Sequence, residues 1–180
     1  RSAAFESMCP GNAPSDMLLN YHRSVAAGGI GMTTVAYAAV TRSGLSFDRQ
    51  LWMRPEIIPG LRRLTDAVHA EGAAAGIQLG HCGNMSHKSI CGCTPVGASG
   101  GFNLYSPTFV RGLRADELPE LARAYGRSVN LAREAGFDAV EIHAGHGYLI
   151  SQFLSPATNH RKDEFGGSLQ NRMRFMDMVL

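Results

Sequence analysis

Helical segments alternate with short apolar segments along most of the chain, and glycine follows the first three helical segments. Helices are predicted over residues 14–28, 55–71 and 116–136 and from Ser168 onward, and strands over residues 30–36, 74–79 and 139–143, with another strand ending near residues 1–4. The helical segments place apolar residues three and four positions apart, and the strand segments are short and mostly apolar. This alternation predicts a parallel sheet covered by helices.

Two α/β architectures remain open at this point, a doubly wound sheet and a (β/α)8 barrel. A dinucleotide-binding doubly wound sheet carries G-x-G-x-x-G directly after an early strand. Here the glycine-rich run 28–31 precedes a strand, and the chain has no phosphate-binding G-x-x-x-x-G-K-[ST] sequence. These features favour the (β/α)8 TIM barrel.

The length of 180 residues suits one domain, and 44% hydrophobic with 18% charged residues excludes a disordered chain. The ends point to a piece of something longer, because the chain begins at Arg1 and stops within an apolar periodic run at Leu180. We therefore expect residues 1–180 to form an incomplete barrel that is truncated at both ends.

The charge pattern argues against a nucleic-acid partner. Seventeen Lys and Arg residues face fifteen Asp and Glu residues, and the two signs are interspersed. No apolar run is long enough for a membrane span. The four cysteines lack zinc-site spacing, and with no signal peptide visible they favour a reducing compartment, the cytoplasm.

The segment 80–112 is predicted as a long glycine-rich loop without helical or strand period. Loops of this length are usually functional or mobile. A second loop is predicted between residue 143 and the helix that Ser168 caps. Within it, residues 159–168 are predicted to form a structural clasp with the following helix, through Arg161, Asp163, Glu164, Asn171 and Arg172.

The unusual polar residues fall where the predicted strands end, which is where parallel barrels carry their chemistry. Ala36 follows one strand, Gln78 lies near the end of the next, and His143 and His146 straddle the end of the third. Tyr148 comes two residues later. Each also has an ordinary structural explanation: a satisfied buried amide for Gln78, histidines bonded to backbone, and packing for Tyr148.

Three functions compete for these residues. A metal-dependent hydrolase would use His143 and His146, but carboxylate partners at strand ends are scarce. A non-catalytic scaffold is the second possibility. A redox enzyme with a flat heteroaromatic cofactor fits better, because Gln78 can pair with a pyrimidine-like edge while two histidines hold an oxygen.

Residues 141–175 resemble the old yellow enzyme family of FMN-dependent NADH:flavin oxidoreductases. The sequence is EIHAGHGYLISQFLSPATNHRKDEFGGSLQNRMRF, and such a long match is highly specific. Residues 1–8, 64–72 and 77–83 add support. The resemblance covers the whole chain but only the N-terminal half or so of a family member, which is a (β/α)8 barrel.

The resemblance implies which residues hold FMN. Gln78 matches the glutamine that hydrogen-bonds the flavin pyrimidine, Ala36 matches the small residue packed by the flavin, and Ala3 and Ala4 match the first-strand segment beneath it. Phe5 stands where many members have a Thr or Cys near the flavin carbonyl, and it cannot donate that hydrogen bond.

The resemblance also implies a reaction, the NAD(P)H-dependent reduction of electron-poor alkenes such as α,β-unsaturated carbonyls. His143 and His146 match the pair that binds the substrate oxygen, His143 also counts among the cofactor-binding residues, and Tyr148 matches the proton donor. The implied partner is a small-molecule substrate. The phosphate-binding loops of such barrels follow strands seven and eight, so this piece alone is expected to be inactive.

Overall fold

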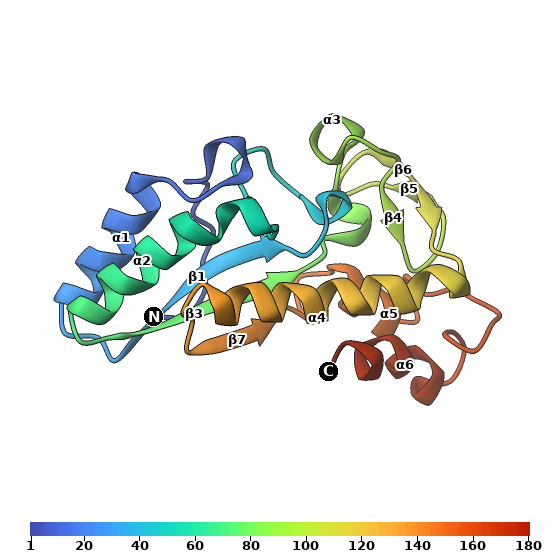
Figure 1. Ribbon diagram of the computed structural model, residues 1–180. Helices are drawn as coiled ribbons and strands as arrows, with labels where there is room; N and C mark the ends of the chain where they lie inside the picture. Colours follow the sequence, from blue (N-terminus) through green and yellow to red (C-terminus); the bar gives the residue numbers. More distant parts are fainter. The chain divides into compact units, whose positions relative to one another are not determined.

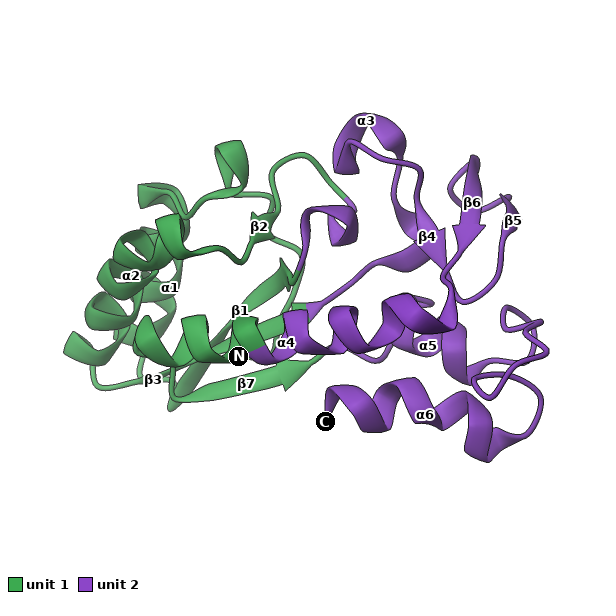
Figure 2. Ribbon diagram, turned by 45° about the vertical axis from the view of Figure 1, so that its right-hand side comes forward, with its two compact units in different colours: residues 1–40, 47–79, 127–142 green, residues 41–46, 80–126, 143–180 purple.

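The computed structural model describes residues 1–180, which form two compact units (Figure 2). Unit 1 comprises residues 1–40, 47–79 and 127–142, and unit 2 comprises residues 41–46, 80–126 and 143–180. Each unit is therefore built from three separate stretches of the chain.

Unit 1 is built around a parallel sheet with the strand order β2-β1-β3-β7. The strands are β1 (Met32–Ala39), β2 (Leu51–Trp52), β3 (Ala74–Gly80) and β7 (Ala139–Ile142). Strands β3 and β7 pair from Gly76 opposite Ala139 to Leu79 opposite Ile142. The strands predicted over residues 30–36, 74–79 and 139–143 are thus confirmed to within two or three residues at each end.

The helices explain why this sheet belongs to a barrel. Helix α1 (Asp16–Ala27) precedes β1, α2 (Ile58–Ala70) connects toward β3, and the end of α4 (Leu118–Glu134) leads into β7. Strands β1, β3 and β7 neighbour one another in chain order, so right-handed crossovers leave the connecting helices on one face, as Figure 1 shows. A doubly wound sheet would carry helices on both faces. The fold is an incomplete (β/α)8 barrel.

Local signals set the predicted helices of unit 1. Ser15 caps α1 by accepting a hydrogen bond from the backbone N–H of Leu18 at 3.2 Å. Helices α1 and α2 pack together, and a Cβ at Gly60 would lie 2.7 Å from Pro14 Cγ, so a glycine is needed at this close approach. Helix α2 buries one stripe against the sheet: Leu61, Leu64, Thr65 and Val68.

Unit 2 corrects the prediction of a loop without period over residues 80–112. This segment contains α3 (Lys88–Cys91) and a three-stranded sheet of order β4-β6-β5. Its strands are β4 (Val96–Gly97), β5 (Gly101–Asn103) and β6 (Thr108–Gly112). Strands of two to five residues are too short to show an alternating pattern, so backbone pairing rather than periodicity defines them.

The predicted loop between residues 143 and 168 is also partly helical, because Leu149–Leu154 form α5. Beyond it, Ser168 caps α6 (Leu169–Val179) by accepting from the N–H of Asn171, as predicted. Short 3-10 helices complete the chain: η1 (Pro10–Asn12), η2 (Arg42–Gly44), η3 (Pro55–Ile57), η4 (Gly83–Met85) and η5 (Ala115–Glu117).

The predicted clasp between residues 159–168 and α6 is confirmed in part: Asn171 and Arg172 on α6 donate to Gly166 O and Gly167 O, whereas the contacts of Arg161 lie outside α6. The Arg161 guanidinium pairs with both carboxylate oxygens of Asp163 and donates to two backbone carbonyls. Asn171 donates to Gly166 O at 3.0 Å, and Arg172 donates to Leu154 O at 2.7 Å. Glu164 is exposed, and the structure gives it no part in the clasp.

The strand expected at residues 1–4 does not form. Only Arg1 runs beside β1, where its amino group donates to Met32 O at 2.6 Å and its carbonyl accepts from Thr34 N at 3.0 Å.

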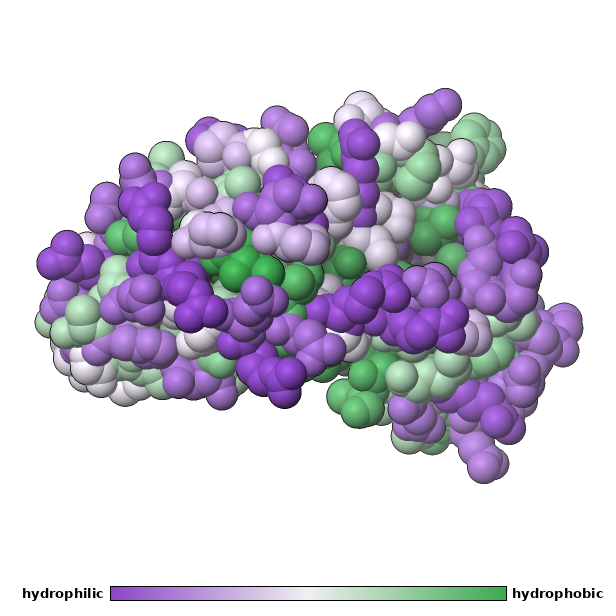
Figure 3. All heavy atoms as spheres, in the orientation of Figure 1, coloured by the Kyte–Doolittle hydropathy of each residue, from purple (hydrophilic) through white to green (hydrophobic).

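The outward face of α4 is hydrophilic, whereas hydrophobic side chains, Leu180 among them, reach the surface at the end of α6 (Figure 3). None of the helices has the length and apolar character needed to cross a membrane.

Candidate active site

Gln78 lies on β3, two residues before the end of that strand, and its side chain is largely buried. Its amide nitrogen donates to the carboxylate of Glu141, the residue opposite it on β7. One N–H of the amide is thereby used, and the second N–H and the carbonyl oxygen remain as a donor–acceptor pair. The structural explanation of Gln78 as a satisfied buried amide therefore accounts for one of its N–H groups and not for the other polar groups of the amide.

Ala36 is half-buried and lies inside β1, three residues before its end, rather than at the end of the strand as predicted. The strand is longer than its β-branched core because pairing with β2 extends it to Ala39. The backbone N–H of Ala36 donates to Glu6 Oε2 at 3.2 Å. Sequence reasoning missed Glu6, whose other oxygen lies 3.0 Å from both Arg1 and His22.

The segment before Glu6 follows the prediction less closely. Ala3 is half-buried and Ala4 is exposed, and neither belongs to a strand. Phe5 is 65% exposed, and its ring meets Phe47 edge-on with 4.8 Å between centroids. These residues present small or apolar surface, with no side-chain hydrogen-bond donor among them.

His143, His146 and Tyr148 form a cluster in unit 2, directly after β7. His143 Nε2 and His146 Nδ1 are 3.1 Å apart, so one ring donates a hydrogen bond to the other. The His143 ring meets the Tyr148 ring edge-on at 5.1 Å between centroids. His143 is buried and His146 is exposed. The structure therefore brings together the three residues that the sequence singled out, and both histidines follow the strand instead of straddling its end.

Burial raises the pKa of the Tyr148 hydroxyl above its ordinary value, against a smaller lowering by the hydroxyl of Ser46. The two oxygens are 3.4 Å apart. A tyrosine with a raised pKa stays protonated at neutral pH, as a proton donor must before the reaction.

The loop that carries these side chains has unusual backbone geometry. His146 and Gly147 both adopt positive φ, at 55° and 68°. Such a conformation strains a residue that has a Cβ, so other contacts must hold it in place.

Gln152, on α5 and almost fully buried, supplies these contacts and was missed from the sequence. Its amide nitrogen donates to Gly147 O at 2.6 Å, Asn84 Oδ1 at 2.9 Å and Cys82 O at 3.1 Å. Its oxygen accepts from Asn84 N at 3.2 Å. A polar residue inside the apolar run LISQFL was the signal that could have found it.

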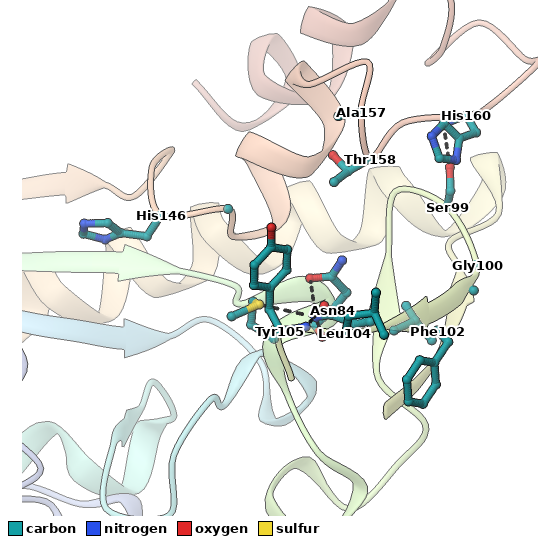
Figure 4. Close-up of a pocket in the computed structure, with 15 residues that line it drawn as sticks. Asn84, Ser99, Gly100, Phe102, Leu104, Tyr105, His146, Ala157, Thr158 and His160 are labelled. Atoms are coloured by element: carbon teal, nitrogen blue, oxygen red, sulfur yellow. Dashed lines mark hydrogen bonds between the residues drawn. The ribbon is translucent and has the colours of Figure 1, made fainter. Parts of the chain in front are cut away.

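A cavity of about 540 Å³ opens beside this loop within unit 2 (Figure 4). Its lining comes from η4, from the β5–β6 region and from residues 146–160: Asn84, Met85, Ser99, Gly100, Gly101, Phe102, Asn103, Leu104, Tyr105, Val110, His146, Gly147, Ala157, Thr158 and His160. The part of the chain predicted to lack regular structure thus contributes most of its wall. A volume of this size suits a small organic molecule.

Comparison with known proteins identifies the family of this chain. Residues 3–180 match the model of the NADH:flavin oxidoreductase / NADH oxidase family. The chain belongs to this family. A family member, the 4,4'-dithiodibutanoate disulfide reductase of Rhodococcus erythropolis, is 42% identical over 180 residues, which are all of this chain and 45% of the relative. The NADPH dehydrogenase of Listeria monocytogenes serotype 4a (strain HCC23) is 40% identical over 92% of this chain and 48% of its own.

Solved structures of the NADH:flavin oxidoreductase family agree in fold. The old yellow enzyme homologue from Zymomonas mobilis superimposes with a TM-score of 0.91 at 29% identity, over 98% of this chain and 52% of that chain. Morphinone reductase in complex with tetrahydroNAD gives a TM-score of 0.91 at 28% identity, over 99% of this chain and 53% of that chain. The chain spans about half the length of the relatives it matches, and the resemblance to old yellow enzymes is confirmed.

The family to which the chain belongs uses FMN with a nicotinamide reductant, and membership of it argues against the metal-dependent hydrolase. The residues of unit 1 fit a flavin ring. Gln78 has a donor and an acceptor left for a pyrimidine edge, and the half-buried Ala36 on β1 carries only a methyl group. No group of three or more His, Cys, Asp or Glu side chains is arranged to hold a metal ion.

Proposed function

We propose that this protein is an FMN-dependent oxidoreductase that uses NAD(P)H to reduce electron-poor alkenes such as α,β-unsaturated carbonyls. The contact between His143 and His146, with Tyr148 beside it, is the observation that carries the proposal. Residues 1–180 would form part of one flavin-binding barrel. A small organic substrate and a cytoplasmic location remain predictions from the sequence.

The cofactor would be held by Gln78, which pairs with its pyrimidine edge, and by the small residues Ala3, Ala4 and Ala36, with His143 also in contact. FMN, when bound, supplies the hydride that reduces the alkene. The chain itself must bind the substrate, stabilise the charge that develops on its oxygen and deliver a proton.

The two histidines suit the second of these tasks. Their facing nitrogens are 3.1 Å apart, so a carbonyl oxygen that replaced their mutual contact would accept from both once the accepting ring takes the tautomer with a hydrogen on its facing nitrogen. Negative charge grows on this oxygen as the alkene is reduced. Removing one donor of this kind from an active site costs about 3–4 kcal/mol in the barrier, which is a few hundredfold in rate.

Tyr148 suits the third task. Burial raises its pKa, so the hydroxyl is protonated across the neutral range and can protonate the α-carbon. The hydroxyl of Ser46, 3.4 Å away, is positioned to orient it.

A spectroscopic assay tests the proposal with residues 1–180 in a purified protein that carries the complete barrel, because this piece alone is expected to be inactive. The flavin absorbance should bleach with NADPH and recover when cyclohexenone is added. His143→Ala should slow recovery at least a hundredfold while the bleaching step is retained. Tyr148→Phe should slow it as well, and Tyr21→Phe, on α1, serves as a matched control. A colourless protein, or His143→Ala recovery at the original rate, would reject the assignment.

The name of the Rhodococcus relative gives a second candidate substrate class. Disulfides are also two-electron acceptors, so a linear disulfide can replace cyclohexenone in the same assay. If only the disulfide restores the flavin absorbance, the alkene assignment is wrong and the flavin reaction itself is retained.

A further inference from the structure

Cys91 and Cys93 form a pair of thiols that the reaction above does not use. They flank Gly92 at the end of α3, and their sulfur atoms are 3.7 Å apart. Gly92 has φ 75°, in the left-handed region, and this tight turn brings two side chains that are two positions apart to the same side. A disulfide needs the two sulfurs to approach to about 2.05 Å, so closing the bond requires only a local movement.

The two thiols differ in access. Cys91 is 2% exposed, whereas Cys93 is exposed at the surface. A disulfide reagent can therefore reach Cys93 first, and Cys91 lies directly behind it. Cys9 and Cys82 have no such arrangement, because both are buried and burial raises the pKa of each thiol to about 12.

Two arginines lie near this pair. A Cβ at Gly92 would lie 3.3 Å from the guanidinium carbon of Arg42, and Arg111 is the second cation that acts on Cys93. Arg111 is already paired with Glu117 at 2.7 Å. Arg42 is exposed and remains the cation best placed to attract an anionic reagent.

We propose that Cys91 and Cys93 are a redox-active dithiol site that exchanges with small anionic disulfides. The Cys93 thiolate attacks one sulfur of the external disulfide and expels the first thiolate, which leaves a mixed disulfide on Cys93. The Cys91 thiolate then attacks Cys93 Sγ and expels the second. The two protons lost by the protein are taken up by the released thiolates, so the protein loses two electrons and the external disulfide gains them.

The ring closed across a single residue is tight, so the Cys91–Cys93 bond should be more easily reduced than an ordinary structural disulfide. Burial, followed by the neighbouring Cys91 thiol, raises the pKa of Cys93, while both arginines oppose this rise. The reaction therefore needs mildly alkaline pH to proceed quickly.

Mass spectrometry tests the proposal independently of flavin chemistry. The purified, reduced protein is treated with glutathione disulfide at pH 8, quenched with an alkylating agent and digested. We expect the peptide containing both cysteines to lose two hydrogens, to carry no glutathione, and to regain its thiols with dithiothreitol. Persistent glutathione on Cys93 of the unaltered protein would overturn the proposal, because Cys91 would then not be the resolving thiol.

Variants separate the two roles. Cys91→Ser should trap glutathione on Cys93, Cys93→Ser should abolish the reaction, and Cys9→Ser is the control that leaves it unchanged. Undiminished oxidation of the Cys93→Ser protein would refute the site. Arg42→Ala should slow the reaction with glutathione disulfide about threefold and leave that with the uncharged hydroxyethyl disulfide unaltered. Equal slowing with both reagents would remove the preference for anions.

Discussion

Gln152 should be the residue whose loss most clearly separates the support of the site from its chemistry. Its amide joins the backbone of the His146 loop to the segment 82–84 through four hydrogen bonds. Gln152→Met keeps the length of the side chain and removes the amide. The variant thus tests the hydrogen bonds with little change in packing volume.

The expected loss in the free energy of unfolding depends on which hydrogen-bond partners of Gln152 also have another partner. Cys82 O also accepts from Met85 N, and Asn84 Oδ1 also accepts from Asn103 Nδ2, so neither is left unpaired. Gly147 O and Asn84 N lose the partner that Gln152 provides. At about 1–3 kcal/mol for each unsatisfied group, and with water able to reach exposed Gly147, we expect a loss of about 3 kcal/mol in the free energy of unfolding.

Urea unfolding of the purified protein, followed by circular dichroism, measures this loss. Gln170→Met, at an exposed position on α6, is the matched control and should change the free energy by less than about 0.5 kcal/mol. The oxidation of reduced flavin by cyclohexenone should also slow at least about tenfold in Gln152→Met, because His146 is no longer held. Stability within 0.5 kcal/mol of the unaltered protein would refute the reasoning. Lost stability with unchanged turnover would show that Gln152 supports the fold and not the site.

Three further predictions concern stability. Burial lowers the pKa of His81 to about 4, so the unfolded chain binds a proton at a higher pH than the folded protein does. The free energy of unfolding should therefore be highest above pH 6.5 and fall by up to about 3 kcal/mol toward pH 4. His81→Gln should remove this pH dependence in melting experiments at different pH. Gly166→Ala should destabilise strongly because its Cβ would lie 2.4 Å from a backbone oxygen, whereas Gly126→Ala, in open space on α4, should stabilise by about 0.5–1 kcal/mol in the same melts. Arg111 lowers the pKa of Glu117 to about 2, so stability from this pair should be lost as pH falls from about 4.5 toward 2, and Glu117→Gln should flatten that decline.

The elements predicted correctly are those with strong local signals. Ser15 caps α1 and Ser168 caps α6 through bonds to N–H groups three residues on, and both contacts can be expected from the sequence alone. The strands β1, β3 and β7 are apolar runs between turns. In contrast, β4 pairs with β6 between Val96 and Arg111, and no local pattern encodes a pairing across that separation.

The same distinction applies to the candidate site. His143, His146 and Tyr148 were identifiable because reactive residue types cluster after a strand. Glu6 and Gln152 act through backbone groups far away in sequence, at Ala36 and at Asn84, and the sequence does not show which carbonyl or N–H a side chain will reach.

These contacts explain how a strained loop can hold His146 against His143. The left-handed backbone of His146 costs about 1–2 kcal/mol for a residue with a Cβ, yet it turns Nδ1 toward His143. The hydrogen bond from Gln152 to Gly147 O contributes a free energy comparable to this strain and lies one residue away from His146. Gln152 fits there because Gly83 has no side chain: a Cβ at that position would lie 2.3 Å from the Gln152 oxygen. The glycine of the segment 82–84 is therefore part of what holds the histidine pair, although it contacts neither ring.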